Sequence, residues 1–397
     1  MVDDIFVHKM PFHHTWLIWW NFQYFGETML VWTILSLTTY VPFKALEVWS
    51  KLPASRQQVQ AQGYCLLAAY TVYFVAFFYF PLKFLFSWEL KCACSFIITC
   101  ETTRIAMKLH SFIRENYPRV ADAKMKLNEH KENEFVFPSI SQFVYFQFCP
   151  SFLYRDEYPR SETRSWKTVA FYFAQCFLVI EYVNLAFTQY VQPWLSDLNM
   201  EYISITEGFL TLFAAILPGI ICLLSLFYGL LHCWLNAFSE MMMFADRQFY
   251  LNWWCSDNMA EYYRNWNLVV HDWLYAYVYK DVSMLIGGRR GLRVAQMCVF
   301  FLSAIFHEYW FGVAFRVFYP VMFMLYFVFG GTFFSVSRLI KSKAAWNTAL
   351  WFNLLIGTGM FVAFYGQEWY ARETCLPYSG TISDFMLPRH WICEYAE

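Results

Sequence analysis

The chain has 397 residues, of which 59% are hydrophobic and 15% are charged, and its formal net charge is −1. Soluble domains carry about 45–50% apolar and about 25% charged residues, so both values indicate an integral membrane protein. There is no excess of basic residues to neutralise phosphates, which argues against a nucleic acid partner. The twelve cysteines include no Cys-x-x-Cys pair and no Cys/His spacing typical of zinc, so we expect no metal site.

Runs of about twenty apolar residues are long enough to cross a bilayer as helices. Such runs cover residues 26–48, 64–86, 90–110, 166–190, 204–233, 293–316, 318–340 and 345–366. They predict an all-α integral membrane protein, a multi-span bundle with about eight transmembrane helices. The third run is the weakest, because Glu101, Arg104 and Lys108 interrupt its second half.

Lys and Arg gather in two long segments between these runs, residues 111–165 and 234–292. Two predicted spans separate the segments, so both lie on the same side of the membrane. The positive-inside rule makes that side cytosolic. We expect amphipathic helices there, and both chain termini on the lumenal side.

Most of the candidate chemistry lies between His232 and Trp310. His307 and Glu308 fall inside a long apolar run, where an ionisable group is costly unless it is buried in protein or faces a water-filled cavity. His307 is therefore a candidate for a functional site, and a His suits the role of general base. The alternative is a structural His whose ring bonds a neighbouring carbonyl.

Several motifs, in order along the chain, resemble those of the sterol O-acyltransferases, which are membrane-bound O-acyltransferases. The main motifs are Phe-Tyr-Leu-Asn-Trp-Trp-Cys at 249–255, Asn267-x-x-x-His271-Asp272-Trp273, and His307 in the following span. Residues 110–116, 154–160 and 367–372 match as well. The resemblance extends over most of the chain.

The resemblance implies an enzyme of the endoplasmic reticulum membrane with the fold of this family. It would transfer a long-chain fatty acyl group from acyl-CoA to a sterol hydroxyl, giving a steryl ester and CoA. The resemblance assigns His307 as the general base and Asn267 as a second catalytic residue that positions acyl-CoA. Besides acyl-CoA as co-substrate we expect no cofactor. Expected partners are the sterol, membrane lipids and further copies of the chain, in a dimer or tetramer.

Two residues near these candidates have roles that stay open. Asn267 and His271 are four residues apart, so on a helix they share one face. His271 either supports the catalytic residues or acts itself. Ser303 lies one helical turn before His307 and either hydrogen-bonds within the site or bonds its own backbone.

Aromatic and basic residues near Asn267 are candidates for substrate binding, since Arg pairs with phosphates and aromatic rings stack on adenine. The candidates are Tyr263, Arg264, Trp266, Trp253 and Trp254. Arg289, Arg290 and Arg293 form a second basic cluster. That cluster either contacts coenzyme A or anchors the protein at the cytosolic membrane surface.

The chain departs from the family pattern at the 249–255 motif and at its N-terminus. Asn252 stands where the family has Asp, so a charge is lost, and Cys255 replaces an Asn amide by a weak donor. Both changes bear on acyl-CoA affinity. The family's N-terminal cytosolic segment and first span have no counterpart here, so we expect residues 1–397 to form a single membrane-bound O-acyltransferase domain without them.

Cys375 and Cys393 lie in the C-terminal tail. The family carries a lumenal disulfide at matching positions, which implies a disulfide between these two cysteines, and a lumenal tail would let it persist. Two free thiols are the alternative.

Other functions stay open beside sterol esterification. One is the same chemistry on diacylglycerol or another lipid alcohol. Another is a catalytically decayed, lipid-binding membrane protein. A third is a transporter with His307 as proton relay, although no inverted repeats suggest it.

Overall fold

The computed structural model describes residues 13–53, 55–128, 135–196, 205–378, 381–391 and 393–394. In these ranges the chain is helical, and its one extended pairing is an isolated bridge between Arg160 and Phe244. The α-helices are α2 (Trp16–Asn21), α3 (Phe25–Thr38), α4 (Tyr40–Lys51), α5 (Arg56–Ser87), α6 (Cys92–Asn128), α7 (Ile140–Phe148), α8 (Trp166–Ala186), α9 (Gln192–Ser196), α10 (Ile205–Phe227), α11 (Leu235–Met242), α12 (Met259–Trp266), α13 (Leu268–Leu274), α14 (Lys280–Ile286), α15 (Gly288–Phe315), α16 (Val321–Phe323), α17 (Gly330–Val336), α18 (Lys343–Thr374) and α19 (Thr381–Met386).

Short π-helical and 3₁₀ segments lie between or beside these α-helices. The π-helical stretches are η2 (Phe187–Val191), η3 (Tyr228–Trp234), η5 (Tyr275–Tyr279) and η6 (Met324–Phe329). The 3₁₀ turns are η1 (His13–Thr15), η4 (Trp253–Cys255), η7 (Ser337–Leu339) and η8 (Arg389–Trp391). Such π-stretches are rare and occur often at functional sites.

The described residues include 7 helical segments that are long and apolar enough to cross a membrane. They are Phe25–Lys51, Arg56–Ser87, Trp166–Ser196, Thr206–Met242, Gly288–Phe315, Val321–Leu339 and Lys343–Thr374. The prediction of an all-α, multi-span membrane protein is therefore confirmed. The structure has one candidate span fewer than the eight predicted, because the 90–110 run lies in α6, a more polar helix of 37 residues.

The charged side chains of α6 find partners inside the protein. Glu101 accepts a hydrogen bond from Nε1 of Trp32 at 2.6 Å. Lys108 is buried, and its Nζ donates to the carbonyl oxygens of Phe146 at 2.5 Å and Cys149 at 2.6 Å. Buried charges are tolerated only with such partners. These bonds explain how α6 packs inside the bundle although its composition is too polar for a lipid-exposed span.

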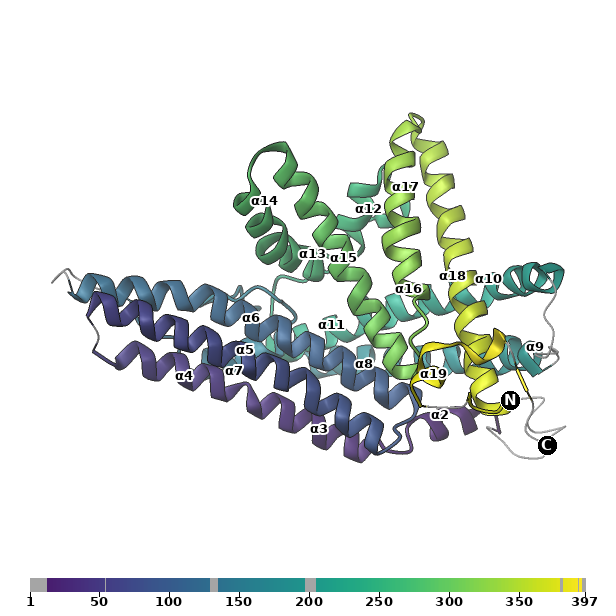
Figure 1. The fold of residues 1–397 in the computed structure, drawn as a ribbon, viewed down its shortest axis with the longest axis horizontal. Helices are drawn as coiled ribbons and strands as arrows, with labels where there is room; N and C mark the ends of the chain where they lie inside the picture. Colours follow the sequence, from purple (N-terminus) through teal and green to yellow (C-terminus); the bar gives the residue numbers. More distant parts are fainter. Residues whose placement is uncertain are drawn as a thin grey trace.

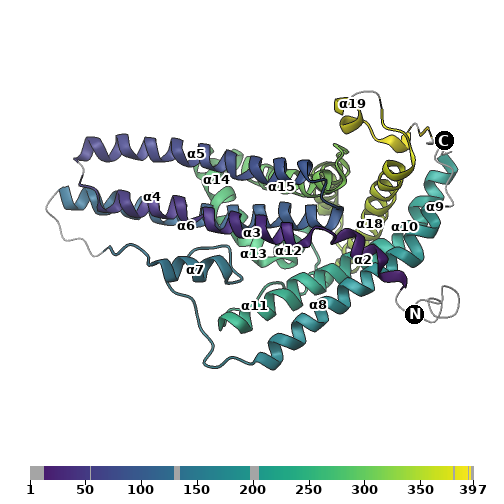
Figure 2. The ribbon, with the colours of Figure 1, turned by 90° about the horizontal axis from the view of Figure 1, so that it is seen from below.

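The helices form three groups. Helices α4, α5 and α6 lie side by side and extend away from the rest of the molecule (Figure 1). Helices α8, α10 and α11 form a second group beside them (Figure 2). Helices α15, α17 and α18 stand across both groups, and α12, α13 and α14 lie near one end of α15 (Figure 1).

The C-terminal tail is tied to α18. A disulfide joins Cys375 and Cys393, whose Cα atoms are 5.4 Å apart. The buried carboxylate of Glu368 accepts from Nε of Arg372 at 2.7 Å and lies 2.9 Å from Nδ1 of His390. These links hold the segment after α18 against that helix.

Helices α10 and α18 cross with their backbones in contact. A Cβ at Gly219 would lie 2.6 Å from the carbonyl oxygen of Thr358, and one at Gly359 would lie 2.8 Å from Cγ1 of Ile216. Small residues permit this close approach between membrane helices. The crossing therefore depends on glycine at both positions.

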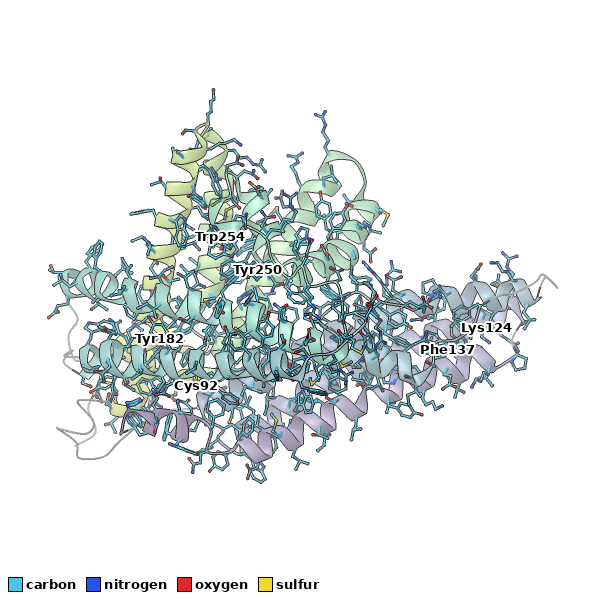
Figure 3. All side chains as sticks on the ribbon, turned by 180° about the vertical axis from the view of Figure 1, so that it is seen from behind. Cys92, Lys124, Phe137, Tyr182, Tyr250 and Trp254 are labelled. Atoms are coloured by element: carbon cyan, nitrogen blue, oxygen red, sulfur yellow. A yellow bond between two sulfur atoms is a disulfide. The ribbon has the colours of Figure 1, made fainter. Side chains whose placement is uncertain are left out.

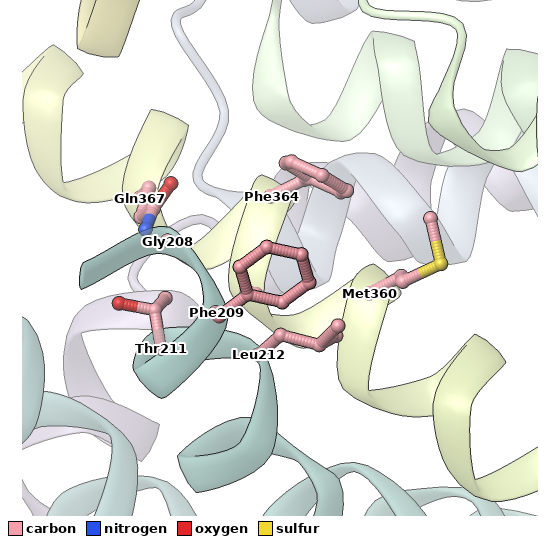
Figure 4. A pocket seen from close by; sticks show the side chains of 8 residues that line it. Gly208, Phe209, Thr211, Leu212, Met360, Phe364 and Gln367 are labelled. Atoms are coloured by element: carbon pink, nitrogen blue, oxygen red, sulfur yellow. The ribbon is translucent and has the colours of Figure 1, made fainter. Parts of the chain in front are cut away.

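A cavity of about 220 Å³ lies between the same two helices (Figure 4). Its lining is mostly apolar and consists of Gly208, Phe209, Thr211, Leu212, Met360, Ala363, Phe364 and Gln367. None of the predicted catalytic or substrate-binding residues lines it, so the candidate site lies elsewhere in the fold.

We expect Gly219→Ala to lower the thermal unfolding midpoint of the purified protein, because the added methyl group forces α10 away from α18. Overpacking of this kind typically costs about 1–3 kcal/mol. The matched control is Gly208→Ala on the same helix, where a Cβ meets nothing within 4 Å. Equal unfolding midpoints for the two variants would show that the crossing tolerates a larger residue.

Candidate active site

His307 lies in the membrane-spanning helix α15, with one ring nitrogen occupied. Its Nδ1 is 2.7 Å from the carbonyl oxygen of Ser303. A carbonyl oxygen can only accept, so Nδ1 carries the proton of the neutral ring and Nε2 keeps its lone pair. Nε2 has no hydrogen-bond partner in the described part of the chain. The ring is thus set up to accept a proton through Nε2.

Aromatic rings hold the His307 side chain on two sides. The Tyr326 ring lies nearly parallel to it at a centroid distance of 4.2 Å, and the Trp310 ring lies at 4.7 Å. Nε1 of Trp310 donates to Oγ1 of Thr103 on α6 at 2.9 Å. The π-stretch η6 carries Tyr326. Sequence reasoning missed this residue, because an aromatic within an apolar run carries no signal.

Glu308 points into different surroundings from its neighbour His307. It is buried, and its Oε1 accepts from the hydroxyl of Tyr365 on α18 at 3.0 Å. Its Oε2 accepts from the backbone N–H of Phe323 at 3.1 Å. Glu308 therefore joins α15 to α16 and α18, next to the candidate base.

Ser303 contacts His307 through its backbone. Its carbonyl accepts the Nδ1 bond, whereas its hydroxyl makes no hydrogen bond with any residue that the structure describes. Of the two roles left open for this residue, the structure supplies neither a hydroxyl bond within the site nor a bond to its own helix.

Asn267 stands between two helices and not on a helix face. Its extended backbone, with φ −151°, ends α12 and precedes α13. Its Oδ1 accepts from the backbone N–H of Val270 at 3.1 Å, so the side chain is the N-cap of α13. Asn267 therefore caps the helix that carries His271, and its backbone carbonyl accepts from the His271 N–H at 2.9 Å, one turn along that helix. The Asn267 NH₂ group has no partner in the described ranges and remains available as a donor.

His271 lies at the more open side of α13. Its side chain is 34% exposed, and its Nδ1 is 3.2 Å from Oδ1 of Asp272. Its ring lies parallel to that of Tyr275 at 6.3 Å. The pair with Asp272 sets His271 apart from the enclosed ring of His307.

The 249–255 motif is fastened to the segment that contains Asn267. The backbone N–H of Leu251 donates to the carbonyl of Asn265, and that of Leu268 donates to the carbonyl of Phe249, both at 2.9 Å. These bonds flank Asn267 on both sides. They explain why two motifs distant from His307 in sequence act as one structural unit.

The two tryptophans of this motif differ in exposure. Trp253 is buried, packs against Trp266 at a centroid distance of 4.6 Å, and leaves its indole N–H without a partner among the described residues. Trp254 is more exposed, and its carbonyl accepts from Nδ2 of Asn347 at 2.8 Å and from Nε1 of Trp351 at 3.2 Å. Figure 3 shows Trp254 and Tyr250 above the long horizontal helices.

The side chains at the two departures add no hydrogen bond to this arrangement within the described structure. The Asn252 side chain makes no capping hydrogen bond to η4, and Cys255 is an exposed free thiol.

Tyr263 links α12 to the surroundings of His307. Its ring lies 4.8 Å from that of Phe300 on α15, and a Cβ at Gly330 on α17 would lie 3.2 Å from its hydroxyl. Burial and the nearby Tyr326 raise the pKa of the Tyr263 hydroxyl, which therefore stays protonated at neutral pH. Tyr326 stacks on His307, so Tyr263 reaches the same aromatic wall.

Arg264 and Trp266 have opposite surroundings. Arg264 is exposed, and its Nε approaches only Oδ1 of Asn265, at 3.4 Å. Trp266 packs in the aromatic cluster with Trp253 and Phe227. Arg264 is free to meet a soluble anion, whereas Trp266 is part of the packed aromatic cluster.

Residues 110–116 support α13 from α6. The His110 ring meets the rings of Trp273 and Tyr277 edge-on, at 5.8 and 5.7 Å. Nε1 of Trp273 donates to Oγ of Ser111 at 2.9 Å, and the Tyr277 hydroxyl donates to Glu115 at 2.8 Å. The 110–116 motif thus positions the helix that Asn267 caps.

The structure brings the predicted residues into two neighbouring groups. His307 and Ser303 belong to α15, while Tyr263, Trp266 and Asn267 belong to the adjoining α12–α13 unit, against which Trp253 of η4 packs. Asn267 and His307 make no hydrogen bond with each other in the described structure, and His271 and Arg264 lie toward its exposed side. No cluster of three or more His, Cys, Asp or Glu residues is placed to hold a metal ion in the ranges that the structure covers.

Comparison with known proteins identifies the family that the sequence motifs indicate. The chain is 38% identical to sterol O-acyltransferase 1 of Chlorocebus aethiops over 96% of its own length and 68% of that protein. It is 41% identical to sterol O-acyltransferase 1 of Mus musculus over 79% of its length and 57% of that protein. With sterol O-acyltransferase 2 of Homo sapiens it shares 37% identity over 95% and 70% of the two chains. Because residues 15–367 also match the membrane-bound O-acyltransferase family, the chain belongs to that family and is a multi-pass O-acyltransferase.

Proposed function

We propose that this protein transfers a long-chain fatty acyl group from acyl-CoA to the hydroxyl of a sterol, in the endoplasmic reticulum membrane. The observation that carries the proposal is the hydrogen bonding of His307 within a membrane-spanning helix, since its Nδ1 contacts the Ser303 carbonyl and its Nε2 has no partner in the described ranges. The names of the relatives support a sterol as acceptor. A base at membrane depth suits an alcohol that is itself dissolved in the bilayer.

The reaction needs no covalent intermediate on the enzyme. Nε2 of His307 takes the proton of the sterol hydroxyl while the oxygen attacks the thioester carbonyl carbon. The tetrahedral intermediate collapses, the carbon–sulfur bond breaks, and the proton on His307 passes to the leaving thiolate of coenzyme A. The products are a steryl ester and free CoA.

Asn267 is suited to steady the oxyanion. Capping α13 occupies its Oδ1 and leaves the NH₂ group, which can donate to the thioester carbonyl as negative charge develops there. Exposed Arg264 lies three residues earlier, where it can pair with a phosphate of coenzyme A. Acyl-CoA would thus enter from the side of α12 with its thioester toward α15.

We expect His307→Gln to reduce steryl ester formation by about a hundredfold to ten-thousandfold, the usual contribution of a general base. The measurement uses microsomes that express the full chain, with labelled oleoyl-CoA and either cholesterol or diacylglycerol. The control is His14→Gln, which changes a histidine outside the candidate site, paired with Glu181 on α8. This variant should keep the turnover of the wild type. If His307→Gln turned over like the wild type, His307 would not be the general base. If triacylglycerol were the main product, the acyl acceptor would be diacylglycerol and not a sterol.

Substitutions at Asn267 separate its two roles. Asp caps helices as well as Asn does, so Asn267→Asp should keep the wild-type unfolding midpoint, whereas Asn267→Ala should lose about 1 kcal/mol of stability. Both variants lack the NH₂ donor and should lose about a hundredfold to a thousandfold in turnover, as for other oxyanion donors. If Asn267→Asp turned over like the wild type, the residue would be only a cap. Turnover and thermal unfolding are measured on the same purified samples.

A further inference from the structure

The turn between α14 and α15 carries an exposed apolar cluster beside three arginines. Met284, Leu285 and Ile286 are all exposed, and Leu285 has 86% of its surface accessible. Arg289, Arg290 and Arg293 follow directly and are exposed as well. We call residues 284–293 the α14–α15 tip. Exposed apolar clusters next to charge mark binding surfaces more often than single exposed residues do.

The tip has a defined shape. Gly287 and Gly288 adopt φ values of +73° and +59°, which glycine reaches without strain. A Cβ at Gly291 would lie 2.7 Å from the carbonyl oxygen of Ser283, so the backbones of α14 and α15 touch. The apolar and basic side chains are therefore held in a fixed relation to each other.

The three arginines have no partner among the residues that the structure describes. No ion pair or hydrogen bond joins Arg289, Arg290 or Arg293 to any residue that the structure describes. The acidic group nearest in sequence, Asp281, pairs with Arg114 of α6 at 3.1 Å. The positive end of the α15 dipole adds to the charge of the three arginines, so the tip carries a concentrated positive charge. An anion bound from outside would reduce the repulsion among these positive charges.

The tip lies at the beginning of a membrane-spanning helix. Met284, Leu285 and Ile286 end α14, and α15 begins at Gly288. Farther along α15, the exposed apolar residues Met297, Phe301 and Ile305 are four residues apart, which places them on one face of the helix. A tip at the start of such a helix lies where a bilayer passes from acyl chains to headgroups.

We propose that the α14–α15 tip binds anionic phospholipid headgroups of the cytosolic leaflet. The arginines pair with the phosphate and carboxylate groups while Met284, Leu285 and Ile286 enter the acyl region. The phosphates of coenzyme A are the other anion available on this side. Their ribose and pantetheine neighbours offer nothing to three aliphatic side chains, so the composition of the tip favours lipid.

Binding at the tip would steady the α12–α13 unit. Helix α14 follows η5 directly, and η5 follows α13, which Asn267 caps. The Arg114–Asp281 pair joins α14 to α6, the helix that also supports Trp273. A fixed tip therefore limits the movement of Asn267 relative to α15.

The test measures lipid binding directly, so its outcome does not depend on the proposed acyl transfer. Full-length protein in mixed micelles is heated with phosphatidylserine or with phosphatidylcholine, and the unfolding midpoint is recorded. We expect phosphatidylserine to raise the midpoint of the wild type above that in phosphatidylcholine. Arg289→Gln/Arg290→Gln should lose at least half of this shift, and Leu285→Ser should reduce it with the charge intact. The soluble headgroup glycerophosphoserine should give no shift.

The charge-matched control is Lys126→Gln/Arg155→Gln, which removes two exposed cations elsewhere and should keep the full shift. A parallel series with coenzyme A distinguishes the two anions. If the arginine variant kept the phosphatidylserine shift, the proposal would fail. It would also fail if that variant lost stabilisation by coenzyme A and kept that by the lipid, since the arginines would then belong to the acyl-CoA site.

Discussion

The hydrogen bond between Nδ1 of His307 and the Ser303 carbonyl decides what the candidate site can do. A His acts as a base only through a nitrogen with a free lone pair, and a carbonyl acceptor forces the proton onto the nitrogen that it contacts. The bond also fixes the ring plane, which Tyr326 and Trp310 then enclose. An intrahelical bond of this kind is ordinary by itself. Its consequence here comes from the membrane-spanning helix around it and from the unoccupied Nε2.

Buried polar side chains elsewhere in the bundle are tolerated because they find partners within the protein. Glu308 is satisfied by Tyr365 and a backbone N–H, and Lys108 is satisfied by two carbonyl oxygens. Nε2 of His307 and the NH₂ of Asn267, in contrast, have no hydrogen-bond partner among the described residues, and the buried Trp253 N–H and Tyr309 hydroxyl lack one as well. Both are of the kind that acyl transfer requires, an acceptor for the hydroxyl proton and a donor for the oxyanion.

The apolar runs, and the place of His307 inside one of them, could be read from the sequence because both signals are local. The 90–110 run could not be judged in the same way, because the partners of Lys108 come from residues distant in sequence. The spacing of Asn267 from His271 predicts two residues one helical turn apart, and the structure makes the first of them the N-cap of α13. The signal for this cap was present in the sequence, since Asn before an apolar segment is a favoured N-cap. Tyr326 gave no signal, since only the folded η6 brings it onto the His307 ring.

The relative position of the two candidate residues is set by contacts remote from both. Asn267 is held by backbone bonds to the 249–255 motif and by the packing of Trp273 on α6, whereas His307 is held within α15. The contact of Gly291 with the Ser283 carbonyl and the position of Tyr263 between α15 and α17 join the two groups. Since an error of about 1 Å can cost a hundredfold in rate, the geometry that we propose for acyl transfer would depend on these glycine-permitted approaches.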